Sequence, residues 1–277
     1  MLSTFIIALR EGLEAALIVG ILVAYLVRTD RRNLLAPLWI GVVSAVALSL
    51  GLGAFLSFTS AELSTRGEEL FAGVTSLTAV VLVTWMVFWM KRTARTLRGD
   101  LHGKIDSALL NGPWSIAAVA FFAVAREGLE TALFIYTNFK TVGVASSASI
   151  GLALGLGISI ALGYLIYNRS VKLNLSSFFT VTGVALIIVA AGVLSYGIHE
   201  FQELGWIAGA DAFAWDVTPW IAKESLLGAT LGGTIGFDTT TSWAQLIGWA
   251  CYLVVVLIPY LSKSSYKSAA STVGAAV

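Results

Sequence analysis

The chain has 277 residues, of which 57% are apolar and only 12% are charged, with a formal net charge of +1 and a mean hydropathy of +0.86. This composition excludes an ordinary soluble domain, and the near-neutral charge gives no indication of nucleic-acid binding. The single cysteine, Cys251, excludes a disulfide framework and a cysteine-based metal site.

Seven apolar runs are each long enough to cross a bilayer, which takes about 20 helical residues. The expected spans are Leu2–Val27, Leu34–Phe58, Leu70–Met90, Trp114–Phe139, Ala148–Tyr167, Phe178–Ile198 and Trp243–Leu261. The sequence therefore predicts an all-α integral membrane protein with seven transmembrane helices, in a single membrane domain over residues 1–277 that is surrounded by lipid.

Basic residues are distributed unevenly between alternate loops. Twelve follow the first, third, fifth and seventh spans: Arg28, Arg31, Arg32, Lys91, Arg92, Arg95, Arg98, Lys104, Arg169, Lys172, Lys263 and Lys267. Three lie in the other loops: Arg66, Lys140 and Lys223. Because basic loops stay in the cytoplasm, we expect the N-terminus outside and the C-terminus inside.

A charged pentapeptide occurs twice within the apolar spans. Arg10-Glu11-Gly12-Leu13-Glu14 in the first span recurs unchanged as Arg126-Glu127-Gly128-Leu129-Glu130 in the fourth. Each ionisable group at membrane depth costs roughly 2.5–3.5 kcal/mol, so charges there indicate a functional site. A repeated set of six strengthens that indication.

The two copies predict an inverted repeat. The first span runs inward and the fourth runs outward, so units of three spans have opposite topology. Gly41 and Gly151, like Gly73 and Gly183, are offset by 110 residues and support the duplication. We expect a 3+3 inverted repeat with unit one at 1–92 and unit two at 113–200. An external loop at 201–242, a seventh helix at 243–261 and a cytoplasmic tail at 262–277 follow.

The spacing within each motif suits cation binding. Residues three apart fall about 60° apart on a helix, so the two glutamates of each copy share a face. The arginine lies four residues before the second glutamate, where an ion pair forms, and the glycine lets another helix or an ion approach. Two crossing motif helices would bring together four carboxylates, which are ligands for Ca²⁺, Mg²⁺, Mn²⁺ or iron. The candidate metal ligands are Glu11, Glu14, Glu127 and Glu130, and the charge-balancing residues are Arg10 and Arg126.

The alternative is that the motifs form buried ion pairs which only hold helices together. Buried ion pairs are an expensive way to stabilise a bundle, and two copies make this less attractive. Local pairing of each arginine with the second glutamate would also leave Glu11 and Glu127 without partners.

Paired Arg-Glu-Gly-Leu-Glu motifs in the first and fourth of seven spans resemble the oxidase-dependent iron permeases, which comprise the fungal high-affinity ferric permease and the bacterial EfeU proteins. The resemblance covers essentially the whole chain. It implies a permease, not an enzyme, that imports ferric or ferrous iron across the plasma membrane, the inner membrane in bacteria. Iron is then the substrate, without a cofactor, and an extracytoplasmic oxidase or peroxidase and an iron-binding protein are implied partners.

The family also has an external Glu-x-x-Glu feature that helps iron to enter. Here His199, Glu200 and Glu203, at the outer end of the sixth span, match that pattern and are the expected external entry point. A solvated helix end is the alternative for the two glutamates. The loop after them, Leu204–Ser242, contains glycines and tryptophans that suggest an interfacial or re-entrant element.

Three other functions remain open. The same carboxylates could carry another metal, such as lead or manganese. A membrane di-iron redox enzyme would need Glu-x-x-His pairs, and neither motif contains histidine. A purely structural membrane subunit would lose its fold, rather than metal flux, when the motifs are changed.

Overall fold

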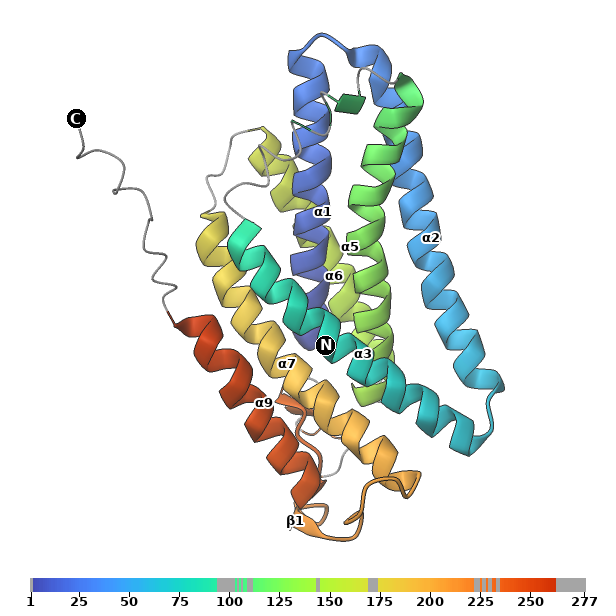
Figure 1. Cartoon of the computed structure of the whole chain (residues 1–277), viewed down its shortest axis with the longest axis vertical. Coiled ribbons are helices and arrows are strands. Elements are labelled where there is room, and N and C mark those ends of the chain that lie inside the picture. Colours follow the sequence, from blue (N-terminus) through green and yellow to red (C-terminus); the bar gives the residue numbers. More distant parts are fainter. Residues whose placement is uncertain are drawn as a thin grey trace, which may run out of the picture.

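The computed structural model describes residues 2–93, 112–142, 145–168, 174–221 and 235–262, together with positions 103, 105, 107, 108, 225, 228, 231 and 232. Within them the chain forms seven helices of 19 to 30 residues and one two-stranded sheet (Figure 1). The long helices are α1 (Leu2–Arg28), α2 (Leu35–Glu62), α3 (Thr65–Thr93), α5 (Pro113–Val142), α6 (Ala145–Tyr167), α7 (Leu175–Glu203) and α9 (Trp243–Leu261). A short 3-10 turn, η1 (Arg32–Leu34), precedes α2. The predicted all-α fold with seven long helices is confirmed.

Five of these helices, α2, α3, α6, α7 and α9, are long and apolar enough to cross a membrane. The other two, α1 and α5, are equally long, at 27 and 30 residues, but contain the charged motifs. On α2 the apolar side chains of Val43, Phe55 and Phe58 point away from the protein. Such an outer surface suits a helix that faces hydrocarbon, where every backbone group is satisfied within the helix.

The helices pack with partners exchanged between the two halves of the chain. The most extensive contacts are those of α1 with α6, α2 with α5, and α3 with α7, while α1 and α5 cross at the centre. In Figure 1, α3, α7 and α9 form a tilted group beside α1, α2, α5 and α6. Ser3 of α1 hydrogen-bonds Asn138 of α5 (2.9 Å), while Glu11 lies near Glu127, so these two helices are antiparallel. In an inverted repeat α1 corresponds to α5 and α2 corresponds to α6. The contact of α1 with α6 is then equivalent to the contact of α5 with α2.

Small residues allow the exchanged pairs to approach closely. A Cβ atom built on Gly41 of α2 would lie 2.2 Å from the Ala117 carbonyl oxygen of α5. On α6, a Cβ atom built on Gly155 would lie 2.7 Å from the Phe5 carbonyl oxygen of α1. No hydrophobic driving force acts between helices in lipid. Close packing at small residues is therefore a main source of the energy that holds them together.

The segment between α7 and α9 contains a two-stranded sheet, and Ile235 and Gly236, between its strands, lie against both helices. Strand β1 (Phe213–Asp216) pairs antiparallel with β2 (Thr240–Ser242), and Ser242 caps α9 in a capping box with Gln245. Gly236, with φ of +71°, lies against Gly192 of α7, and Trp249 Nε1 of α9 donates to the Ile235 carbonyl oxygen (2.8 Å). Gly192 is about 16 Å from the end of α7 at 1.5 Å per residue. This segment therefore reaches well inside the bundle.

Some expectations fall on residues outside the described part of the chain. They are the cytoplasmic tail from 263 onwards, the loop charges at 95, 98, 104, 169, 172 and 223, and the side chain of Lys140. The boundaries of the repeat units also stay predictions.

Candidate metal centre

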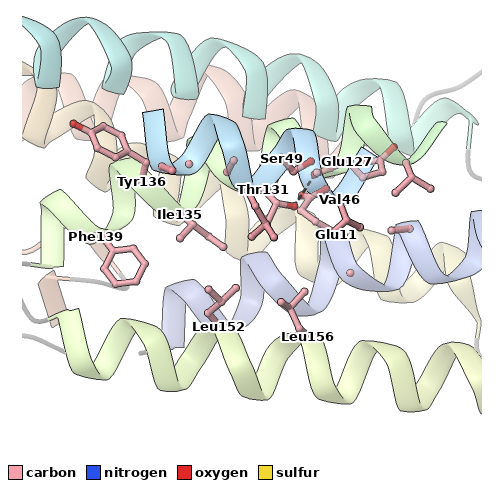
Figure 2. A pocket seen from close by; sticks show the side chains of 18 of the residues that line it. Glu11, Val46, Ser49, Glu127, Thr131, Ile135, Tyr136, Phe139, Leu152 and Leu156 are labelled. Atoms are coloured by element: carbon pink, nitrogen blue, oxygen red, sulfur yellow. Dashed lines mark hydrogen bonds between the residues drawn. The ribbon is translucent and has the colours of Figure 1, made fainter. Parts of the chain in front are cut away.

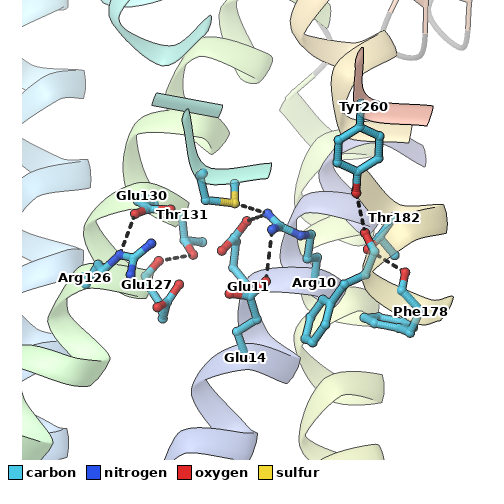
Figure 3. Close-up of polar contacts among 12 residues, drawn as sticks. Arg10, Glu11, Glu14, Arg126, Glu127, Glu130, Thr131, Phe178, Thr182 and Tyr260 are labelled. Atoms are coloured by element: carbon cyan, nitrogen blue, oxygen red, sulfur yellow. Dashed lines mark hydrogen bonds and ion pairs between the residues drawn. The ribbon is translucent and has the colours of Figure 1, made fainter. Parts of the chain in front are cut away.

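The two central helices bring the repeated motifs together. One carboxylate oxygen each from Glu11, Glu14 and Glu127 lies within 4.8 Å of the other two. Their exposed fractions are 1%, 1% and 4%, so all three are buried. In the described part of the chain, this is the one cluster of three or more acidic, histidine or cysteine residues close enough to hold a single metal ion. Figure 3 shows Glu11 and Glu127 between the two motif arginines.

Arg10 is held by both glutamates of its own motif. Its Nη1 lies 2.9 Å from Glu11 Oε1 and its Nη2 lies 3.1 Å from Glu14 Oε1, and the guanidinium also contacts the Met86 sulfur of α3. The expected pairing with the second glutamate is present, but Glu11 is not left without a partner as local pairing alone implied. The guanidinium is a fork of donors and can bind two carboxylates at once.

Arg126 is placed differently. Its Nε lies 3.1 Å from Glu130 Oε1, while its guanidinium carbon lies over the rings of Trp89 (3.9 Å to the centroid) and Trp85 (5.7 Å), both on α3. The Arg126 side chain is 30% exposed, against 1% for Arg10. Glu130 pairs with Arg126 and is not among the three residues whose carboxylate oxygens lie within 4.8 Å of one another, and Glu127 has no arginine partner among the described ion pairs.

Several buried oxygens of the centre have no hydrogen-bond partner. They include one oxygen each of Glu11, Glu127 and Glu130. A buried polar atom without a partner costs about 1–3 kcal/mol, and more when charged, so native structures keep few of them. Their concentration here indicates a place where a ligand supplies the missing interaction.

The motif glycines are contacted by serines at equivalent positions of the two units. A Cβ atom on Gly12 would lie 2.3 Å from Ser159 Oγ of α6, and one on Gly128 would lie 2.0 Å from Ser49 Oγ of α2. Ser49 and Ser159 are 110 residues apart, the offset that relates Gly41 to Gly151. Sequence reasoning missed both serines, because their contacts with the motif glycines depend on the pairing of α2 with α5 and of α1 with α6.

A cavity of about 860 Å³ lies between α1, α2, α5 and α6. Glu11 and Glu127 line one part of it, and from there it extends toward Phe139 and Leu152 (Figure 2), with Gly53 also in its lining. These residues belong to the C-terminal parts of α2 and α5 and the N-terminal part of α6. The cavity thus connects the two glutamates with one end of the bundle, along a mostly apolar wall.

The expected external residues lie together at the C-terminal end of α7. His199 Nε2 is 3.9 Å from Glu203 Oε1, and both side chains are partly exposed. Glu200 is half-buried and accepts a hydrogen bond from Tyr196, and the negative charges of Glu68 and Glu69 of α3 act on it. Sequence reasoning missed the two α3 carboxylates, because the pairing of α3 with α7 is not visible in the sequence.

Asp216, in the loop after α7, has a local structural role. Its Oδ1 accepts hydrogen bonds from the Thr218 backbone nitrogen (3.0 Å) and Oγ1 (2.6 Å), which lower the pKa of Asp216. These bonds stabilise the turn after β1.

A bundle of membrane-length helices with an acidic centre is the architecture of a multi-pass membrane transporter. The chain belongs to the iron permease FTR1 family, whose model matches residues 1–269. The ferrous iron permease EfeU of Escherichia coli O6:H1 is 39% identical over 264 residues, which cover 94% of this chain and 95% of that protein. The Yersinia pestis protein of the same name is 38% identical over 280 residues, covering 100% of this chain and 97% of that protein. No solved structure matches the chain. The suspected family is confirmed, and the protein is a permease, not an enzyme.

Proposed function

We propose that the protein imports iron through an intramembrane site formed by Glu11, Glu14, Glu127 and Glu130. The observation that carries this proposal is the convergence of three of these carboxylates, with unpartnered oxygens, beside a cavity in an iron permease. Glu130 lies with Arg126 when the site is empty and joins the ion when that pair opens. Iron is the substrate, and no resident cofactor is invoked.

The charge of the site favours a divalent ion. Four carboxylates and the guanidiniums of Arg10 and Arg126 leave two negative charges when all six groups are ionised. Uncompensated charge in a low-dielectric interior is costly, so a cation of charge +2 is the matching occupant. Ferrous iron meets this requirement and is the ion in the names of the EfeU relatives. Ferric iron would leave an excess positive charge.

Entry is proposed from the outer side of the plasma membrane, the inner membrane in bacteria. The cavity extends toward the ends of α2, α5 and α6 whose loops contain few basic residues, which the positive-inside rule places outside. His199, Glu200 and Glu203, with the charges of Glu68 and Glu69 acting on Glu200, form an acidic region that attracts cations to this side. An extracytoplasmic iron-binding protein would deliver the ion, whereas an oxidase or peroxidase partner fits only a ferric substrate.

Two other functions find less support. Manganese or lead could use the same carboxylates, since oxygen ligands do not by themselves exclude them. A di-iron redox enzyme needs histidine near the carboxylates, whereas the described histidine, His199, is at the end of α7.

Uptake of radioactive iron into proteoliposomes tests the proposal. We expect wild-type protein to accumulate iron and the Glu14→Gln and Glu130→Gln variants to lose uptake while keeping the thermal stability of a folded protein. Glu62→Gln, at an exposed position at the end of α2, is the charge-matched control and should transport normally.

Normal uptake by either motif variant would refute the site. Iron oxidation without accumulation would favour the redox enzyme. Stronger competition by manganese or lead than by unlabelled iron would identify that metal as the substrate. Loss of folding in the motif variants would favour the structural role.

A further inference from the structure

Ser49 of α2 and Ser159 of α6 occupy matching positions. Each presses its hydroxyl oxygen against the glycine of a motif, Gly128 or Gly12, in the other three-helix unit. Each also donates its proton to its own helix: Ser49 Oγ to the Ala45 carbonyl oxygen (2.9 Å) and Ser159 Oγ to that of Leu156 (2.8 Å). As packing elements the two serines are equivalent.

They differ in access to the cavity. Ser49 is partly accessible and lines the cavity beside Glu127, whereas Ser159 is 0% exposed and does not line it (Figure 2). A packing role requires no such difference.

The Ser49 hydroxyl also has the chemistry of a cation ligand. A hydroxyl has one proton and two lone pairs, and the Ser49 proton is used within α2. The lone pairs are therefore available beside the unpartnered Oε2 of Glu127, which is itself only 4% exposed. Serine and threonine hydroxyls bind Mg²⁺ in phosphate-binding loops, so a neutral oxygen of this kind suits a hard divalent ion.

We infer that Ser49 is a further iron-binding residue, which contributes a neutral oxygen ligand as the ion passes from the cavity to Glu127. The inference rests on the proposed transport of iron through the motif glutamates. Ser159 has the packing contact but not the access, and it is not a ligand.

The test compares iron-uptake kinetics of Ser49→Ala with those of Ser159→Ala in proteoliposomes. Each change removes one oxygen, one hydrogen bond within the helix and one contact with a motif glycine, so purely structural effects should match. We expect Ser49→Ala to raise the KM for ferrous iron roughly three- to tenfold, the effect of losing one polar interaction, with Vmax unchanged. Ser159→Ala should keep the wild-type KM. Equal effects of the two changes, or an unchanged KM in Ser49→Ala, would overturn the inference.

A second measurement does not depend on transport. In a Cys251→Ala background, the Ser49→Cys variant should react with a small thiol reagent, and ferrous iron should slow the reaction. The Ser159→Cys variant should not react. A Ser49→Cys thiol that is unreactive, or whose reaction iron does not slow, would contradict the assignment.

Glu127→Gln, assayed in the same series, separates this inference from the proposed function. If Glu127→Gln transports normally, the glutamate site itself is wrong. If Glu127→Gln is inactive and Ser49→Ala behaves as wild type, only the assignment of Ser49 fails.

Discussion

The guanidinium carbon of Arg126 lies 3.9 Å from the centre of the Trp89 ring, a cation–π contact at membrane depth. The equivalent arginine, Arg10, has no such contact among those described and instead binds both glutamates of its motif. Arg126 is thus held by Glu130 and Trp89 together, and no described ion pair joins it to Glu127. Glu127, whose own motif arginine is engaged elsewhere, lines the cavity.

Replacing Trp89 should weaken iron binding. Without the ring, Arg126 can turn toward Glu127 and compete with the ion, as Arg10 already does at Glu11. A cation–π contact contributes about 0.5–2 kcal/mol, so we expect Trp89→Leu to raise the KM for iron roughly three- to thirtyfold. The KM of Trp89→Phe should lie between those of the wild type and Trp89→Leu. Trp85→Leu, whose ring is 5.7 Å from Arg126, is the control and should change KM less. An unchanged KM in Trp89→Leu would show that the ring does not position Arg126.

A methyl group at Gly128 should destabilise the protein. Its Cβ would lie 2.0 Å from Ser49 Oγ and 2.9 Å from Ser49 Cβ, so α2 and α5 must move apart. Overpacking of this kind costs about 1–3 kcal/mol. We expect Gly128→Ala to lower the melting temperature, and Ser49→Gly to restore part of it in the double variant. Gly51→Ala is the control, because nothing lies within 4 Å of that position. A melting temperature of Gly128→Ala equal to the wild-type value would mean that the helices are not in contact there.

Reporter fusions should place Asn33 and Gly103 in the cytoplasm and Ser64 outside. The reason is the excess of basic residues, twelve against three, in the segments after the first, third, fifth and seventh spans, two of which contain Asn33 and Gly103. Alkaline phosphatase, active outside, and green fluorescent protein, fluorescent inside, report the two sides. A cytoplasmic location of Ser64 would mean that the protein has the opposite orientation in the membrane, with the cavity extending toward the cytoplasmic side.

The double change Glu200→Gln, Glu203→Gln should reduce uptake mainly at low external iron. Negative charge at the mouth raises the local cation concentration and the rate of capture without tight binding, so abundant iron compensates for its loss. Glu14→Gln should stay inactive at every concentration, and Glu62→Gln serves as a control for surface charge. If the double variant and Glu14→Gln fail alike at all iron concentrations, or if the double variant is normal at limiting iron, the end of α7 has no role in capture.

The sequence predicted the helices well because apolar runs are local. Trp243–Leu261 was placed without error, while α7 begins at Leu175 and ends at Glu203, beyond the expected Phe178–Ile198, since polar residues continue the helix past the hydrocarbon. The motif glutamates could be proposed as ligands from their spacing alone. Ser49, Trp89 and Glu68 could not, because each reaches its partner through contacts between helices, α2 with α5 or α3 with α5 and α7, that no local pattern encodes.

The exchange of partners between the two halves has a consequence for biogenesis. α1 makes few contacts with α2, which follows it, and its most extensive contacts are with α6, which begins only at Ala145. Until α5 and α6 have left the ribosome, an inserted first motif helix would have only its own charges and Met86 of α3 to shield Arg10, Glu11 and Glu14. Charges at that depth disfavour stable insertion. We therefore expect the insertion machinery to retain α1 until the second motif helix arrives, so that assembly of the acidic centre completes the insertion of the helices that form it.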